Sequence, residues 1–147
     1  MLNPAVLKIE VLDESGFPLI VYDFRRHEID KEALLSDKKV LKSSLLVAAV
    51  HGLSEDGSLT NIIDMGKEKF LVLKRKEIIV VLSLSPHVDP SSEKIQLFAR
   101  SLLYGIMKLH ERMGINPTDI PLQEYLDKID EPFRKLVKNL IIRVGLQ

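Results

Sequence analysis

Several features that would point to a particular chemistry are missing from this chain. It contains no cysteine, which excludes disulfide bridges, thiolate zinc sites and thiol nucleophiles. Its formal net charge is +0, because 21 basic residues balance 21 acidic ones. Bulk binding to nucleic acid usually needs a basic excess, so we expect no nucleic-acid partner.

Long hydrophobic runs are missing too. The longest, at 45–50 and 78–82, are far shorter than the roughly 20 residues that a membrane-spanning helix needs. Residues 1–10 contain neither a basic region nor a long apolar stretch, so no signal peptide is expected. The sequence therefore predicts a cytoplasmic protein. Its shortage of Asn, Gln and Cys beside abundant Lys, Glu, Ile, Leu and Val is a bias of heat-adapted proteins and hints at thermostability.

No catalytic or metal-binding motif emerges from the sequence. The string 52–58 resembles a phosphate-binding loop only in its glycines, because it lacks the lysine and contains the carboxylates of Glu55 and Asp56. The string that starts at His110 has a glycine at position 114, where a metalloprotease needs its second histidine. Paired acidic residues fit solvated turns. We expect a non-enzymatic protein without a metal or cofactor.

The first half of the chain predicts strands around one helix. Partial period-2 alternation over 6–12 and the apolar run 17–22 predict two strands, joined by a turn. A helix is expected to start at Asp30, or alternatively at Ser36 or Asp37, and to end near residue 52.

Three more strands are expected, at about 59–63, 70–73 and 78–84. The last is rich in β-branched residues and suits a central position that is covered on both faces. Connections this short force neighbouring strands to be antiparallel.

The second half of the chain predicts helices. Asp89, followed by a proline, is expected to open one that Gly114 ends. A short helix is expected to open at 116–119, and Asp130 to open a last one. The order is thus β-β-α-β-β-β-α plus two C-terminal helices, and it predicts a five-stranded antiparallel sheet with helices packed on it, in the α+β class.

Two basic clusters are candidates for an interaction surface. Arg25 and Arg26 follow the first hairpin, and Lys74, Arg75 and Lys76 lie at the turn of a later one. They could contact an acidic partner or make peripheral contact with a membrane surface. Alternatively, they are solubilising charges that guard sheet edges, and the acidic residues interleaved with them favour this interpretation.

The last expected helix is the third candidate. It has an apolar face and a basic face, so it could pack on its own sheet, lie on a membrane or dock in a partner's groove. Burial of apolar side chains at roughly 1.5–3 kcal/mol each would hold it on the sheet. Phe133, Leu136 and Leu140 on its apolar face complete the candidate interaction surface.

The order of elements resembles that of longin domains, within the wider roadblock, longin and profilin-like architecture. The small apolar stretch 45–50 resembles the first helix of that group, and 58–84 is similar to its three-strand meander. The resemblance covers about residues 5–113. It places the chain, 1–147, in a single domain with a helical extension at 115–147.

This resemblance implies a protein-interaction platform without catalytic residues. Longin and roadblock domains commonly form dimers and bind small GTPases or trafficking proteins, so we expect a homodimer or a regulator of such a partner. The alternative is a small-ligand sensor of PAS-like or profilin-like type, in which Tyr22, Tyr104 and Tyr125 would supply polar contacts. A third alternative is an enzyme whose carboxylates meet only on folding.

Overall fold

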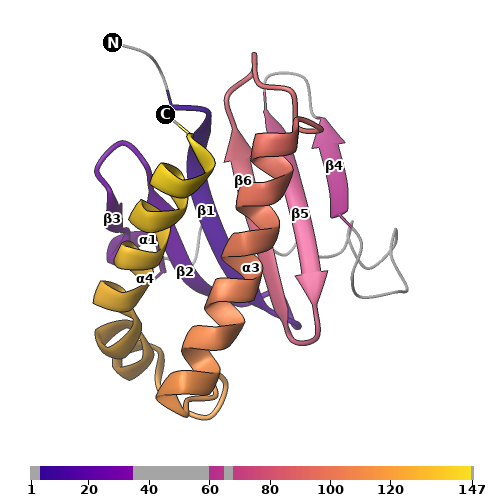
Figure 1. Ribbon diagram of the computed structural model, residues 1–147. Helices are drawn as coiled ribbons and strands as arrows, with labels where there is room; N and C mark the ends of the chain where they lie inside the picture. Colours follow the sequence, from indigo (N-terminus) through magenta and orange to yellow (C-terminus); the bar gives the residue numbers. More distant parts are fainter. Residues whose placement is uncertain (1–3, 35–59, 65–67, 147) are drawn as a thin grey trace.

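The computed structural model describes residues 4–34, 60–64 and 68–146. In these residues a six-stranded antiparallel sheet packs against two long helices, which confirms the α+β class. Figure 1 shows both helices on the same face of the sheet. The strands are β1 (Val6–Asp13), β2 (Pro18–Asp23), β3 (Glu28–Ile29), β4 (Thr60–Asp64), β5 (Lys69–Arg75) and β6 (Ile78–Leu84). Their order across the sheet is β3-β2-β1-β6-β5-β4.

Two antiparallel units lie side by side to make this sheet. β1 and β2 form a hairpin in which Ile9 lies opposite Tyr22, and β4, β5 and β6 form a meander. The seam between the units is the pairing of β1 with β6, where Ile9 lies opposite Leu82. Every residue of β6 except Ser83 is buried. This confirms the central, doubly covered strand that its composition predicted.

The sixth strand corrects the expected number of five. β3 has only two residues, and it pairs with the end of β2, where Tyr22 lies opposite Ile29 and Asp23 opposite Glu28. The turn between them includes His27 in the left-handed region, with a φ of 52°. Two residues, one of them an exposed glutamate, are too few to show a period-2 pattern, so the sequence does not indicate this strand.

The helix expected after the first hairpin falls mostly outside the described residues. Its described part is α1 (Lys31–Leu34). Asp30 caps α1 as expected, because its carboxylate accepts a 3.0 Å hydrogen bond from the backbone N–H of Ala33. The two alternative starts and the expected end near residue 52 lie outside the described residues.

The first long helix, α3 (Glu93–Met113), begins later than expected. Its N-cap is Ser92, whose hydroxyl accepts a hydrogen bond from a backbone N–H of the first turn. Asp89 belongs to a preceding turn, where it accepts hydrogen bonds from the backbone N–H and the hydroxyl of Ser91. The helix ends at Gly114 as predicted, because this glycine adopts a left-handed φ of 63°.

The two helices expected after Gly114 are one helix, α4 (Leu122–Val144), which runs through Pro132. Residues 116–119, expected to open a helix, form none, and 117–119 lie in a turn and a bend that precede α4. A proline inside a helix costs about 3 kcal/mol. Buried side chains nevertheless continue at helical spacing on both sides of it, so packing offsets that cost. These buried residues are Tyr125, Leu126, Ile129, Phe133, Val137 and Leu140.

The main core lies between the helices and the sheet face that they cover. α3 contacts β5 and β6, and α4 contacts α3, β2 and β3, so the last helix packs on its own domain. Because side chains alternate between the faces of a strand, a second and smaller apolar cluster lies on the opposite face. It consists of Leu12, Phe70, Val72, Ile79 and Val81, with Ile63 packed against it.

Candidate functional site

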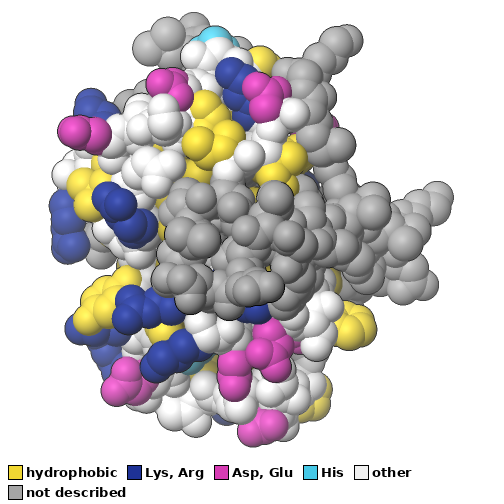
Figure 2. Space-filling model, turned by 90° about the vertical axis from the view of Figure 1, so that its right-hand side faces the viewer, with side chains coloured by type: hydrophobic (Ala, Val, Ile, Leu, Met, Phe, Trp, Pro, Cys, Tyr) yellow, Lys and Arg dark blue, Asp and Glu magenta, His cyan; other side chains and the backbone are white. Residues whose placement is uncertain are grey.

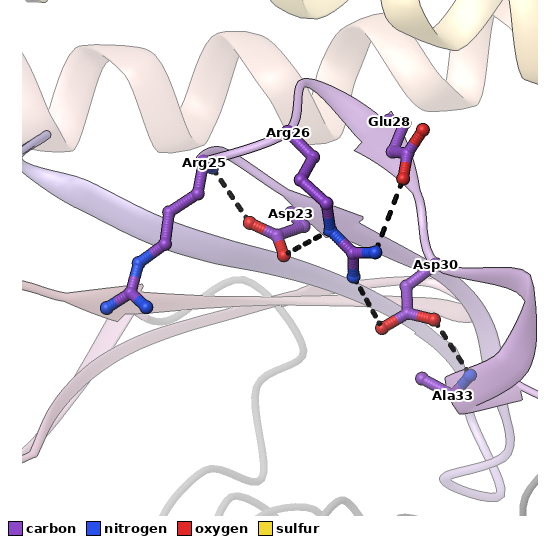
Figure 3. Close-up of polar contacts among 6 residues, drawn as sticks. All are labelled: Asp23, Arg25, Arg26, Glu28, Asp30 and Ala33. Carbon is purple, nitrogen blue, oxygen red and sulfur yellow. Dashed lines mark hydrogen bonds and ion pairs between the residues drawn. The ribbon is translucent and has the colours of Figure 1, made fainter.

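Arg26 lies among three carboxylates at the turn between β2 and β3 (Figure 3). Its guanidinium nitrogens are 3.2 Å from Asp23, 3.5 Å from Glu28 and 3.6 Å from Asp30. Asp23 also accepts a 2.8 Å hydrogen bond from the backbone N–H of Arg25. We call these five residues the β2–β3 corner. The corner contains two arginines and three carboxylates, so it is not a basic surface.

Electrostatics at the corner favour the ionised carboxylate of Asp23. Partial burial acts to raise the pKa of Asp23, but the hydrogen bonds from the Arg25 backbone and the Arg26 side chain outweigh it. The pKa of Asp23 is therefore lowered from its ordinary value of 3.8. Figure 3 shows the Arg25 side chain pointing away from these carboxylates, and the residue is exposed.

The second basic cluster lies at the opposite end of the sheet. Lys74 and Arg75 end β5, and Lys76 occupies the turn to β6 with a left-handed φ of 55°. Lys76 lines a cavity that is also lined by the acidic residues Glu14 and Glu77. The two basic clusters are therefore far apart in the structure, and each lies among acidic neighbours.

The apolar candidates on α4 divide between core and surface. Phe133 is fully buried, and its ring meets the ring of Tyr22 edge-on at a centroid distance of 5.7 Å. Leu140 is buried as well. Leu136 is only half-buried, and it faces a groove between the two long helices. Of the three, only Leu136 is available to a partner.

This groove has a volume of about 560 Å³ and lies between α3 and α4. Its apolar floor consists of Leu109, Pro132 and Leu136. Gly105 lets the helices approach closely there, because a Cβ atom at this position would lie only 2.7 Å from Cδ1 of Leu136. We call this feature the outer groove.

The rim of the outer groove is basic. Lys108 and Arg112 line it from α3, Lys135 lines it from α4, and all three are exposed. Glu131 is the acidic residue in the lining, and it forms a 3.2 Å ion pair with Lys135. Three positive charges and one negative charge leave a local excess of two positive charges, in a chain whose formal net charge is +0.

An aromatic side chain adjoins this rim. Tyr104 is 52% exposed, and the amine of Lys108 lies 4.9 Å from the centroid of its ring, within the range of a cation–π interaction. In Figure 2 the helix-bearing face of Figure 1 forms the left-hand margin. Dark-blue lysine and arginine side chains lie there among yellow hydrophobic ones.

A second cavity, of about 640 Å³, lies beside the loop between α3 and α4. His110 lines it and is 8% exposed, and Nε2 of His110 is 2.7 Å from the hydroxyl of Tyr125. Burial lowers the pKa of His110 below 6.5 and raises that of Tyr125 above 10. Both side chains are therefore neutral at pH 7. Of the three tyrosines considered as ligand contacts, Tyr22 is in the core and Tyr104 is on the surface.

The cations of the outer groove are the residues that sequence reasoning missed. Lys108 and Arg112 are four positions apart, a spacing that places two side chains on one face of a helix. Gly105 in the middle of a helical pattern is a second signal, because such a glycine often has a packing reason. These signals concern only α3. The contribution of Lys135 depends on how α4 packs.

Among the described residues, no group of three or more His, Asp or Glu side chains is arranged to hold a metal ion. No helix in the described ranges is long and apolar enough to cross a bilayer. No protein-family model matches the chain, and comparison with curated proteins finds no significant relative. The function must therefore be argued from the site itself.

Proposed function

We propose that this chain is a non-enzymatic protein-interaction module that binds its partner through the outer groove. The observation that carries the proposal is the combination of an apolar floor with a charged, exposed rim. Protein interfaces have the same arrangement, with an apolar centre inside a polar border. The groove lining contains no Ser, Thr, Cys or His side chain, and its lysines and its glutamate are exposed rather than desolvated as an activated nucleophile would be.

The element order supports a longin-like architecture for this module. In the described residues, the β1–β2 hairpin comes first, β3 and α1 follow it, and then come the β4–β6 meander and the long helix α3. The resemblance rests on this order together with the apolar helix expected at 45–50, which lies outside the described residues. The resemblance implies a small GTPase or a trafficking protein as the partner, and a homodimer as the assembly. Because one fold serves many functions, these two identities need a test at the groove itself.

Site-specific photo-crosslinking tests the proposal. Asn139 is exposed and lines the groove, whereas its exposed neighbour Lys138 does not line it, so the two positions form a matched pair. Benzoylphenylalanine would replace each residue in turn, and cells of the native host would be irradiated. We expect a discrete crosslinked protein, identified by mass spectrometry, from position 139 and not from position 138. Equal yields from both positions, or none from position 139, would contradict the proposal.

A small-ligand sensor is the second candidate, and the cavity beside His110 is the observation that favours it. Of the pair, only His110 lines this cavity, and its neutral imidazole can donate or accept a hydrogen bond and so orient a polar ligand. Native mass spectrometry of the purified protein would show a retained ligand as added mass. The substitution His110→Gln should remove that mass. A spectrum of the bare chain alone would contradict this candidate.

A further inference from the structure

The length and direction of the outer groove suit one α-helix. On α3 its lining extends from Gly105 to Arg112, and on α4 from Glu131 to Asn139. At 1.5 Å per residue, each wall is about 10–12 Å long. That length accommodates two turns of a third helix, whose anchoring side chains would be spaced at i, i+3 or i+4, and i+7.

The apolar floor of the groove favours a partner helix that has an apolar stripe. Leu109 and Leu136 are each half-buried, so part of each side chain is covered by the domain and part faces the groove. Covering the exposed part with apolar side chains removes it from water, which is favourable in proportion to the area buried. A wholly polar helix would leave the floor in contact with water, so the floor would contribute no hydrophobic free energy to its binding.

The cations on both walls of the groove favour a partner helix with acidic residues on both sides of its apolar stripe. Lys108 and Arg112 are one helical turn apart on α3, and Lys135 lies on the α4 side. Lys135 has an acidic neighbour in Glu131, but the side chains of this pair are 72% and 71% exposed. An ion pair so exposed is weak and exchanges readily. All three cations are therefore available to carboxylates of an incoming helix.

A tyrosine beside the rim and an arginine in it are of the residue types that contribute most to binding energy at protein interfaces. Tyrosine and arginine are enriched among such residues. Tyr104 and Arg112 are both exposed on α3, and the ring of Tyr104 contacts Lys108, which lines the groove.

We infer that the outer groove binds an amphipathic α-helix of a partner protein, and that the polar face of this helix is acidic. The inference rests on the proposed function and adds the chemistry of the partner. Leucine-like side chains of the partner enter the floor between Leu109 and Leu136. Its carboxylates meet Lys108 and Arg112 on one wall and Lys135 on the other.

A second copy of this chain fits the groove poorly. In a two-fold symmetric contact the same surface occurs on both copies, so the basic rim of one groove would face the basic rim of the other. Like charges brought together at an interface are costly. A homodimer would therefore use another surface.

An anionic membrane fits less well than a helix. Its surface cannot enter a groove between two helices to reach Leu109 and Leu136. The excess of two positive charges would supply only the electrostatic attraction, which is small for so few cations near a lipid surface.

The inference is tested with a synthetic probe. The probe is a fluorescently labelled peptide of about four helical turns, with leucine at i, i+3, i+4 and i+7 and glutamate at the other positions. A control peptide keeps the leucines and has lysine in place of glutamate. Binding to the full chain is measured by fluorescence anisotropy at low and high salt. Vesicles of equal parts phosphatidylserine and phosphatidylcholine test the lipid alternative by co-sedimentation.

Two double variants report on the site. Lys108→Glu with Lys135→Glu reverses charges in the groove, and Lys138→Glu with Arg143→Glu makes the same change of charge on exposed positions outside it. We expect the acidic peptide to bind the wild type. The groove variant should bind it at least about tenfold more weakly, and the control variant should bind it as the wild type does. Circular dichroism checks that both variants fold.

Three results would overturn the inference: tighter binding of the basic peptide, equal loss in both double variants, or binding of vesicles without binding of the peptide. Failure of the inference differs visibly from failure of the proposed function. If position 139 crosslinks a protein and the groove variant leaves that crosslink unchanged, the module binds a partner that is not an acidic helix. If neither crosslink nor peptide binding occurs, both proposals fail.

Discussion

The β2–β3 corner and the outer groove both hold exposed cations, but they use them differently. In the corner, Arg26 is surrounded by carboxylates of its own chain, and its ion pairs connect the end of β2 to the start of α1. In the groove, neither Arg112 nor Lys108 has an ion pair with the described residues, and the amine of Lys108 lies over the ring of Tyr104. A cation shared by several carboxylates of its own chain acts on the fold, whereas one with no such partner, or with a single exposed one as Lys135 has, is available for recognition.

The largest expected effect on stability comes from α4. One side of this helix is buried in the core near the β2–β3 corner, and the other side lines the outer groove. Phe133→Ala should lower the free energy of unfolding by about 3–5 kcal/mol, because it leaves a cavity against Tyr22. Leu136→Ala should cost roughly half as much or less, because Leu136 is only half-buried. Urea denaturation measures both. Equal losses would show that the two sides of α4 do not differ.

Lowering the pH should change the stability contributed by the buried side of α3, but not the stability contributed by the side that lines the outer groove. The pKa of His110 is lowered by burial, so the unfolded chain takes up the proton first. The stability that neutral His110 contributes is fully present above about pH 6.5 and is lost as the pH falls through the lowered pKa. Urea midpoints measured against pH should fall less steeply in His110→Gln. Lys108→Gln, a change on the exposed groove side of α3, should keep the wild-type slope.

Removing one arginine from each region compares the regions directly. Arg26→Gln should lower the urea midpoint, because three carboxylates lose their shared partner. Arg112→Gln should leave it unchanged. Loss of Arg26 also raises the pKa of Asp23 towards its ordinary 3.8. The lowered pKa of Asp23 contributes stability above about pH 4 that is lost as the pH falls through it, so this acid loss should shrink in Arg26→Gln. Equal urea midpoints for Arg26→Gln and Arg112→Gln would show that the two arginines do not differ in their contribution to stability.

The smallest effect on stability, with a clear effect on binding, is expected from Gly105→Ala. The added Cβ meets the flexible end of Leu136 at 2.7 Å and pushes it into the groove. Alanine favours a helix over glycine by about 1 kcal/mol, so the net change in unfolding free energy should be within about that amount. Affinity for the acidic peptide should fall, whereas Ser101→Ala, outside the groove lining on α3, should leave it unchanged.

Local pattern predicted most of the elements, because it depends on neighbours in the chain. The alternation in β1, the apolar run of β6 and the glycine that ends α3 all follow from short-range rules. The errors came where packing overrides such rules. Pro132 marks a helix start in a local pattern, but burial on both sides of it keeps α4 continuous.

The site was harder to predict than the fold, because it depends on distances across the chain. At the β2–β3 corner the acidic residues lie within four positions of Arg26 in the chain, and the turn there brings their carboxylates to its guanidinium. The cations of the groove form no run in the sequence. They become neighbours because α4 returns alongside α3. Clustering along the chain was therefore a poor guide to clustering on the surface.

The seam between β1 and β6 constrains the order in which this protein can fold during synthesis. β1 and β2 can pair as soon as they leave the ribosome, but β1 finds its second neighbour only after the whole meander has emerged. Contacts so distant along the chain form slowly, because a long loop must close first. Until then, one edge of the early hairpin stays open. The nascent chain therefore passes through a stage in which an unpaired strand edge is exposed to aggregation.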